Sequence, residues 1–299
     1  MARRTAIRDL PFKHDAKPNL GFELLRLADL FARDARGVLP EPLAVPQRPE
    51  FHSVYLGTRG RGTIVIDFTP VPLGVGRATI VVRGRVEQFV PARGLDAHIL
   101  LFSPEFLALG QDPRAIDPLR SARTLSPSWS PPTCELPAAA RRAIAELTDQ
   151  LAAEQLRPLD AIQPALMSAL LRAVLLQIER CAGGASSARS AELERFFTIL
   201  ERDCTRTRAV AHYAREAGLS PRRLGELLVA HTGRSTKQVI DERVVLEQKR
   251  LLAHTDISVK ELAARTGFDE PTNLIKFFRH HTRTTPLAFR TFLPSGRRS

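Results

Sequence analysis

The chain has 299 residues, of which 43% are hydrophobic and 25% charged, and its formal net charge at pH 7 is +12. This composition is typical of a globular protein of about two domains, because one domain usually takes about 100–200 residues. The longest apolar runs are far shorter than the ~18 residues that a membrane span needs, so no transmembrane helix and no membrane partner are expected.

The positive charge suggests a polyanionic partner, although other anionic surfaces attract basic proteins as nucleic acids do. From residue 191 onward there are 20 Lys and Arg residues against 13 Asp and Glu residues, so this part is the more basic one per residue. The cysteines are Cys134, Cys181 and Cys204, an odd number without CxxC spacing. This favours reduced thiols and a cytoplasmic protein over a disulfide framework or a zinc site. The basic first residues also lack the apolar stretch of a secretory signal.

A β-rich domain is expected over residues 21–136, after a basic N-terminal arm at residues 1–20. A helix is expected within residues 21–34, and short runs rich in Val, Ile and Phe follow it. Gly and Pro punctuate these runs, and 16 of the 22 prolines lie at or before Pro137, which excludes long helices there. The pattern predicts an antiparallel barrel or sandwich. The runs are residues 51–57, 62–68, 77–84, 85–91 and 97–103.

Two helices are expected over residues 137–182, where apolar residues recur at helical spacing on either side of Pro158. The second helix is apolar on more than one face. That fits packing against both its own domain and a partner subunit, but an ordinary buried helix explains it equally well. Residues 183–190 have the composition of a flexible linker, and we place the domain boundary there. The apolar positions are Ile144, Leu147 and Leu151, then Ile162, Leu166, Leu170, Val174 and Ile178.

A weak internal repeat lies in the C-terminal part, with residues 213–236 and 262–286 as its two copies. Each copy has the pattern of a helix, a turn that a glycine opens, an N-cap residue and a second amphipathic helix. Ser220 before Pro221 is a good helix start, and Asp269 with Pro271 is similar. The pattern predicts two helix-turn-helix units, whose second helices enter the major groove of DNA.

The segment between the copies, residues 237–255, contains no Gly or Pro. It is expected to form one helix of about 18 residues, hence about 27 Å long. With the bodies of the two units added, the recognition helices would lie about one DNA turn, ~34 Å, apart. A purely structural helical bundle with incidental basic residues is the alternative.

Residues 220–252 and 257–290 resemble the AraC/XylS family of transcription regulators, and the second stretch is similar to the family signature. The resemblance covers about 100 residues and is looser before residue 182. It implies an α+β protein: a cupin-like sensor domain (21–136), a helical dimerisation segment (137–182) and an all-α DNA-binding domain (191–299). Double-stranded DNA, a small-molecule effector, a second copy of the chain and RNA polymerase are the partners that it implies. It favours activation modestly.

Four residues depart from the family pattern. Arg283 replaces the usual glycine at the end of the second recognition helix, so it must adopt a left-handed backbone or shift the cap, and it could add a phosphate contact. Asn273 and Leu274 stand where the family often has an aromatic residue and then Phe. Glu226 stands where a basic residue is common, and it would either repel phosphate or accept a hydrogen bond from cytosine. These departures concern the target sequence rather than the mode of binding.

The candidate DNA contacts are the residues of the two recognition helices that lie away from the expected core face. Arg to guanine and Asn to adenine are the natural pairings. The residues are Arg222, Arg223, Gly225 and Glu226 on the first helix, and Glu270, Thr272, Asn273, Ile275, Lys276 and Arg279 on the second. Arg234, Lys237 and Arg243 are candidates for phosphate contacts, which position a protein without reading sequence.

No metal, cofactor or catalytic residue is expected. The barrel-like region has only His52 and His98 and no HxH motif, which disfavours the metal chemistry of cupin enzymes. Polar residues that could hold a small effector are His52, Tyr55, Asp67, Arg83 and Gln88. Two other functions remain open: a ligand-independent regulator controlled by its abundance or by a protein partner, and a cupin enzyme with an accessory DNA-binding module.

Overall fold

The computed structural model describes residues 8–10, 12, 20–39, 42–90, 92, 94–112, 117, 119, 122, 124–125, 132–182 and 191–292. The chain divides into two compact units, residues 8–188 and residues 189–299, and each is described by itself. Most of the expected N-terminal arm and all of the expected linker lie outside the described residues.

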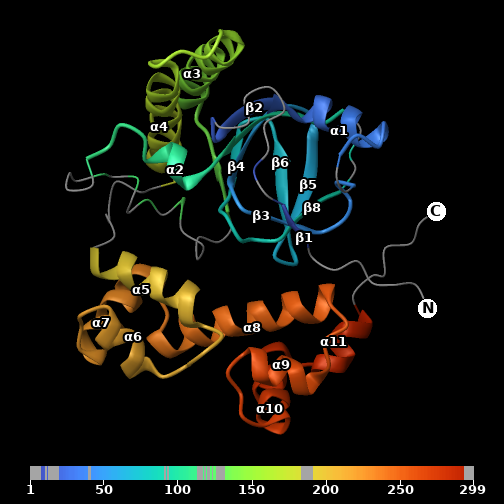
Figure 1. Ribbon diagram of the computed structural model, residues 1–299, viewed down its shortest axis with the longest axis vertical. Helices are drawn as coiled ribbons and strands as arrows, with labels where there is room; N and C mark the ends of the chain where they lie inside the picture. The colour runs from blue at the N-terminus through green and yellow to red at the C-terminus, as the bar shows by residue number, and fades with distance from the viewer. Residues whose placement is uncertain are drawn as a thin grey trace. The chain divides into compact units, whose positions relative to one another are not determined.

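The N-terminal unit contains two five-stranded sheets (Figure 1). The strand order is β1-β3-β8-β5-β6 in one sheet and β10-β7-β4-β9-β2 in the other. Neighbouring strands are antiparallel except for the parallel pair β1 and β3. The strands are β1 Arg8–Leu10, β2 Phe22–Arg26, β3 Gln47–Pro49, β4 His52–Arg59, β5 Arg61–Ile66, β6 Thr69–Gly74, β7 Arg77–Val81, β8 Glu87–Val90, β9 Asp96–Phe102 and β10 Thr133–Glu135.

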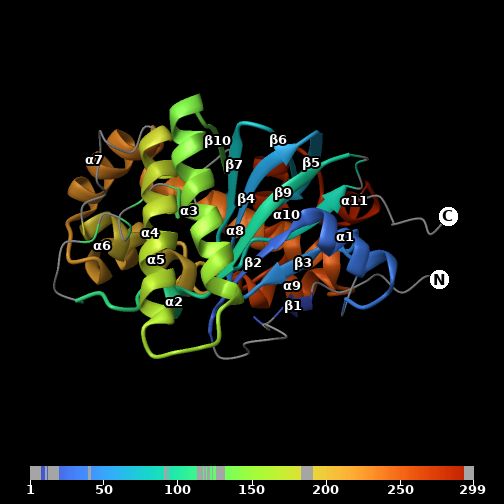
Figure 2. The ribbon, with the colours of Figure 1, turned by 90° about the horizontal axis from the view of Figure 1, so that it is seen from above.

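Alternation along the strands builds two apolar layers. Tyr55 and Ile99 project from the second sheet into one core with Ile64 and Phe89 of the first sheet. The opposite face of the second sheet packs against helices α3 (Ala138–Leu156) and α4 (Gln163–Cys181), which run side by side along it (Figure 2). Short helices α1 (Leu27–Ala35) and α2 (Pro104–Leu107) complete the unit.

Two sequence predictions for this unit need correction. The helix expected within residues 21–34 begins only at Leu27, because Phe22–Arg26 form β2, which pairs with β9. The expected barrel is not closed: among the described residues, no hydrogen-bonded strand pair joins the two sheets. The strand β6, which contains Pro70 and Pro72, was not among the expected runs. It lies at the edge of its sheet, where prolines are tolerated because no neighbour needs their missing N–H.

The described residues of the C-terminal unit form helices and the turns between them, organised around one long helix, α8 (Figure 1). Helices α5–α7 lie at one end of α8 and α9–α11 at the other. One apolar core connects them, with Tyr213, Leu228, Leu252 and Phe278 fully buried. The helices are α5 Ala191–Asp203, α6 Val210–Glu216, α7 Pro221–Thr232, α8 Thr236–His254, α9 Val259–Arg265, α10 Pro271–Thr282 and α11 Pro286–Phe292.

Within the part of the chain that the structure describes, no helix combines the length and the apolar character needed to cross a membrane. The same residues contain no group of three or more His, Cys, Asp or Glu side chains placed to hold a metal ion.

Candidate DNA-binding site

The first helix-turn-helix unit consists of α6 and α7. Gly218 opens the turn with a φ of +74°. The Ser220 hydroxyl then accepts a hydrogen bond from the Arg223 backbone N–H at 3.2 Å, so it caps α7 as its sequence predicted. Leu224 and Leu228 are fully buried, which turns the opposite face of α7 outward. On that face the Arg222 guanidinium donates to the Glu226 carboxylate at 3.0 Å.

The second unit consists of α9 and α10 and repeats this plan with one difference. The N-cap of α10 is Glu270, whose side chain makes no capping hydrogen bond, so the prediction of Asp269 as the cap is wrong by one residue. Pro271, at the first helical position, determines where the helix starts, because the N–H that it lacks needs no partner there. Leu274 and Phe278 are fully buried, and α10 presents Thr272, Asn273, Ile275, Lys276 and Arg279 outward.

Arg283 ends α10 in the left-handed conformation, with a φ of +60°, as Gly233 ends α7 at +70°. Of the two possibilities for this residue, the structure therefore has the left-handed backbone and keeps the cap in place. The Arg283 N–H donates to the Arg279 carbonyl at 2.9 Å. A side chain in this conformation costs about 1–2 kcal/mol relative to glycine.

Helix α8 supports both units. It has 19 residues, against about 18 expected, and it starts with a capping box formed by Ser235 and Gln238. Asp241 of α8 receives the Lys237 ammonium at 2.6 Å and lies 3.8 Å from His281 Nε2 of α10. Buried Gln248 donates to Thr266 at the end of α9 at 3.2 Å. These polar contacts fix the second unit against α8.

The three expected phosphate contacts have different environments. Arg234, just before α8, and Lys237, in its first turn, are about half exposed, and each pairs with a carboxylate of α8. Arg243 is only 14% exposed, and its guanidinium binds Glu201 at 2.9 Å and Glu247 at 3.1 Å. Arg243 is therefore largely buried between two carboxylates, and its ion pair with Glu201 joins α5 to α8.

A loop of the first unit packs on the turn of the second one. A Cβ added to Gly267 would lie 3.0 Å from the Arg206 carbonyl oxygen and 3.1 Å from that of Thr205. Gly267 also has a φ of +72°, so both its conformation and its surroundings require glycine. The sequence indicated the turn but gave no sign of this contact.

Comparison with known proteins agrees with this geometry. Residues 213–291 match the model of a helix-turn-helix domain family. Over 278 residues the chain is 23% identical to the HTH-type transcriptional activator RhaR of Cronobacter sakazakii, covering 89% of this chain and 95% of that one. Residues 213–291 thus form a helix-turn-helix domain, and the chain is similar over most of its length to a transcriptional activator.

Two further proteins each match about a third of this chain. The HTH-type transcriptional regulator GlxA of Rhizobium meliloti is 34% identical over 100 residues, which are 33% of this chain and 30% of that one. A solved regulator from Chromobacterium violaceum with an AraC-type DNA-binding domain aligns at 21% identity with a TM-score of 0.32, covering 34% of this chain and 94% of that one. The curated relatives RhaR and GlxA are transcription regulators, and the chain is a DNA-binding transcription regulator.

A cavity of about 90 Å³ lies in the core between the two sheets of the N-terminal unit. Its polar groups are Gln47, Tyr55 and Glu87, and the Tyr55 hydroxyl donates to Glu87 Oε2 at 2.9 Å. Burial raises the pKa of Glu87 to about 7, and the hydrogen bond from Tyr55 opposes that rise. The apolar lining residues are Leu10, Leu30, Leu39, Leu43, Phe51, Phe89, Ile99 and Leu101.

Of the five expected effector contacts, only Tyr55 lines this cavity. His52 stacks on Phe102 at 5.2 Å, toward the helices, and accepts a hydrogen bond from the backbone N–H of exposed Arg83 at 3.2 Å. Desolvation, followed by the positive charge of Arg83, lowers the pKa of His52 to about 4. Asp67 instead binds Arg85 Nε at 2.8 Å.

Gln88 donates to the Ala44 carbonyl at 2.7 Å and so has a backbone partner outside the cavity. The neighbouring Glu87, which sequence reasoning did not select, lines the cavity instead. The signal that could have identified Glu87 is its separation of two positions from inward-facing Phe89, since alternate residues of a strand share a face.

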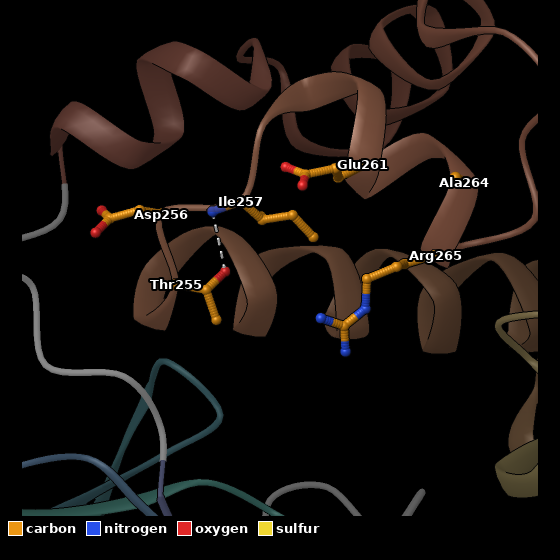
Figure 3. A pocket seen from close by; sticks show the side chains of 6 residues that line it. All are labelled: Thr255, Asp256, Ile257, Glu261, Ala264 and Arg265. Atoms are coloured by element: carbon orange, nitrogen blue, oxygen red, sulfur yellow. Dashed lines mark hydrogen bonds between the residues drawn. The ribbon is translucent and has the colours of Figure 1, made fainter.

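An open groove marks the junction of α8 and α9 (Figure 3). The Thr255 hydroxyl accepts a hydrogen bond from the Ile257 N–H at 3.3 Å, and the Arg290 guanidinium of α11 donates to the Ile257 carbonyl. Glu261 belongs to a capping box with Ser258. The groove is therefore the surface of a well-bonded helix junction, which orients α9 and the turn that follows it.

Proposed function

We propose that α7 and α10 read two successive major grooves on one face of double-stranded DNA. The observation that carries this proposal is that one continuous helix, α8, supports both helix-turn-helix units. At ~1.5 Å per residue its 19 residues span about 28 Å. The bodies of the two units extend that distance toward the ~34 Å of one DNA turn.

The exposed faces of the two helices suggest different kinds of readout. Asn273 offers an adenine-reading amide, and Ile275 offers an apolar contact for a thymine methyl group. On α7, Arg222 is 91% exposed and Glu226 holds it through an ion pair. DNA would compete with that pair, and Arg222 could then bind guanine while Glu226 accepts from cytosine. Arg234 and Lys237 would add phosphate contacts that position α7.

Selection of bound sequences from a random duplex library by the full chain tests this proposal. We expect a bipartite motif whose two elements are centred about 10–10.5 base pairs apart, matching one turn of DNA. A motif with one element would contradict the proposed use of both units. Binding to all sequences with equal affinity would contradict sequence reading altogether.

The second part of the proposal is a homodimer formed through α4, the segment expected to mediate dimerisation. Residues Ile162, Leu166, Ala169, Ala173 and Leu176 follow one another at spacings of four and three, as in a coiled-coil seam. Ile162 is 74% exposed, Leu166 43% and Leu176 37%. The opposite face of α4 packs in its own core, with Leu171 and Val174 fully buried. A second copy of the same helix would cover the exposed stripe.

Sedimentation of the full chain tests the dimer. The double variant L166E/L176E places two negative charges on the stripe without touching the core face, and we expect it to sediment as a monomer. The matched variant A145E/Q150E adds the same two charges at exposed positions of α3 and should remain dimeric. A wild-type monomer at micromolar concentration would overturn this part of the proposal.

The third part concerns control: the N-terminal unit would be a cupin-type sensor in a cytoplasmic activator. The apolar cavity with its few polar groups is the form that small-molecule sites usually take. The protein would have two conformational states that differ in DNA affinity or in contact with RNA polymerase. An effector would shift the balance between them to the extent that it binds one state more tightly than the other. Transcription in vitro from a promoter that carries the selected motif tests activation. Unchanged transcription with every candidate effector would favour control by abundance or by a protein partner.

A further inference from the structure

The cavity of the N-terminal unit contains a carboxylate that has no cationic partner among the described residues. Glu87 is 8% exposed, and no Lys or Arg of the described part of the chain forms an ion pair with it. Its Oε2 receives the Tyr55 hydroxyl at 2.9 Å, whereas no described residue donates a hydrogen bond to its Oε1. A buried acid usually has a compensating charge or a full set of donors, because its desolvation is costly.

The remaining lining favours an apolar body next to this acid. Apart from Gln47, Tyr55 and Glu87, every lining residue is aliphatic or Phe. The Gln47 amide donates to the Pro42 carbonyl at 3.1 Å, so it already has a protein partner. The volume of about 90 Å³ accommodates about six to nine water-sized groups, which corresponds to one aromatic ring or a short aliphatic chain.

We propose that this cavity binds a small apolar amine, whose ammonium group donates to Glu87 while its hydrocarbon part contacts the leucines and Phe89. The inference rests on the proposed sensor function and names the chemical class of its effector. An ammonium would supply both the missing charge and the missing donor. A carboxylate ligand would instead bring a second negative charge to a buried acid, at a cost that the apolar lining does not offset.

The Tyr55–Glu87 pair then determines both orientation and selectivity. The phenol donates to one carboxylate oxygen and leaves the other for the ligand. Burial already raises the pKa of Glu87 to about 7, so an ammonium that stabilises the ionised form would release a proton on binding near neutral pH. Tyr55 and Glu87 are the titratable groups of the described lining.

Three probes of matched size test this proposal on the full chain without DNA: benzylamine, benzyl alcohol and benzoate. We expect calorimetry to show saturable binding of benzylamine and no binding of benzoate. In Glu87→Gln the affinity for benzylamine should fall by about 10- to 100-fold, the loss of one charge-assisted hydrogen bond, while that for benzyl alcohol changes little. In Tyr55→Phe, which keeps the carboxylate, benzylamine should still bind better than benzoate.

Three outcomes would overturn the proposal: no binding of benzylamine, equal binding of benzoate, or an unchanged affinity for benzylamine in Glu87→Gln. DNA binding by the same samples separates this inference from the proposed function. If DNA binding is intact and benzylamine does not bind, only the ligand class is wrong. If benzylamine binds but leaves DNA affinity and transcription unchanged, the site exists and the sensor role is wrong.

Discussion

The guanidinium carbon of Arg208 lies 3.5 Å from the centre of the Phe268 ring, and this contact joins the two helix-turn-helix units. Arg208 lies in the loop between α5 and α6, whereas Phe268 follows Gly267 in the turn of the second unit. The same guanidinium lies 5.0 Å from the Phe277 ring of α10. A cation over two aromatic faces thus contributes to the position of the second recognition helix.

Replacing Arg208 with alanine should therefore affect the cooperation of the two units more than either unit alone. A partly buried cation–π contact is worth about 0.5–2 kcal/mol, which predicts a loss of about 2- to 30-fold in affinity for the bipartite DNA site. Affinity for DNA that carries one element should change little. Arg208→Lys should be intermediate, because lysine keeps the charge and loses the planar stacking.

Fluorescence anisotropy with full and half sites measures this difference. Arg206→Ala is the matched control, since Arg206 is an exposed arginine of the same loop. Equal losses on full and half sites in Arg208→Ala would show that Arg208 supports binding in another way, for example through phosphate.

Replacing Asn273 with alanine should relax specificity at one base position of one DNA element. Asn273 is exposed on α10, next to fully buried Leu274. Loss of a bidentate contact to adenine costs about 1–3 kcal/mol. Changing that base pair should therefore no longer alter the affinity of the Asn273→Ala variant for DNA. Arg222→Ala should act in the same way on the other element. Equal weakening on specific and random DNA would contradict base reading by the residue tested.

Replacing Arg283 with glycine should stabilise the C-terminal unit. The left-handed backbone of Arg283 costs about 1–2 kcal/mol. Glycine relieves this strain but loses more conformational entropy on folding. We therefore expect the unfolding free energy of this unit to rise by about 0.5–1 kcal/mol. Thermal unfolding of the full chain measures the shift in the transition of this unit.

Arg279→Gly is the control for charge, because it removes an exposed arginine from the interior of α10 and should cost about 1 kcal/mol. A decrease in stability in Arg283→Gly would show that the arginine side chain makes contacts that outweigh the strain. If stability rises while DNA affinity falls, Arg283 contacts phosphate in the complex.

The buried acid of the cavity should make the N-terminal unit less stable as pH rises. Burial raises the pKa of Glu87 from its ordinary 4.5 to about 7 in the folded chain. Between these values the folded state binds more protons than the unfolded one, so its stability falls as pH increases from about 4.5 and levels off above about 7. At 1.36 kcal/mol per pKa unit, this shift in the pKa of Glu87 corresponds to at most about 3.4 kcal/mol of unfolding free energy.

Comparison with Glu87→Gln isolates this effect, because His52 acts in the opposite direction. The lowered pKa of His52, about 4, makes stability rise with pH up to about 6.5 in both proteins. We expect the difference in unfolding free energy between Glu87→Gln and wild type to grow in favour of the variant from pH 5 to pH 8. A difference that is independent of pH would show that Glu87 titrates normally.

Local signals in the sequence were sufficient to predict the helices of the two helix-turn-helix units and the long helix between them. Ser220 before Pro221 determines where α7 begins, and the absence of Gly and Pro from residues 237–255 is enough to predict α8. These features act within a few residues along the chain, so one sequence shows them. The single wrong cap, Asp269, arises because Asp is a preferred N-cap residue, whereas Pro271 at the first helical position makes Glu270 the cap.

Long-range partners account for what the sequence did not show. Phe22–Arg26 have helical periodicity but form a strand, because β9 pairs with them from more than seventy residues away. By residue type alone, Arg243 is a candidate for a phosphate contact. Only the fold shows that Glu201 and Glu247 bind its guanidinium. The cavity residues come from β1, α1, β3, β4, β8 and β9 and from the loops that flank β3. Tyr55 could therefore be guessed by residue type, whereas Glu87 required the register of its strand.

The continuity of α8 has a consequence for how proteins of this architecture can change. One residue added to a helix rotates everything beyond it by about 100° and shifts it by ~1.5 Å. An insertion within residues 236–254 would therefore turn α10 away from its present orientation relative to α7, and, under the proposed mode of binding, off the DNA face that α7 reads. Substitutions can alter which bases are read, but single insertions or deletions in α8 would abolish joint reading. The spacing between the two DNA elements should be inherited unchanged while their base sequences diverge.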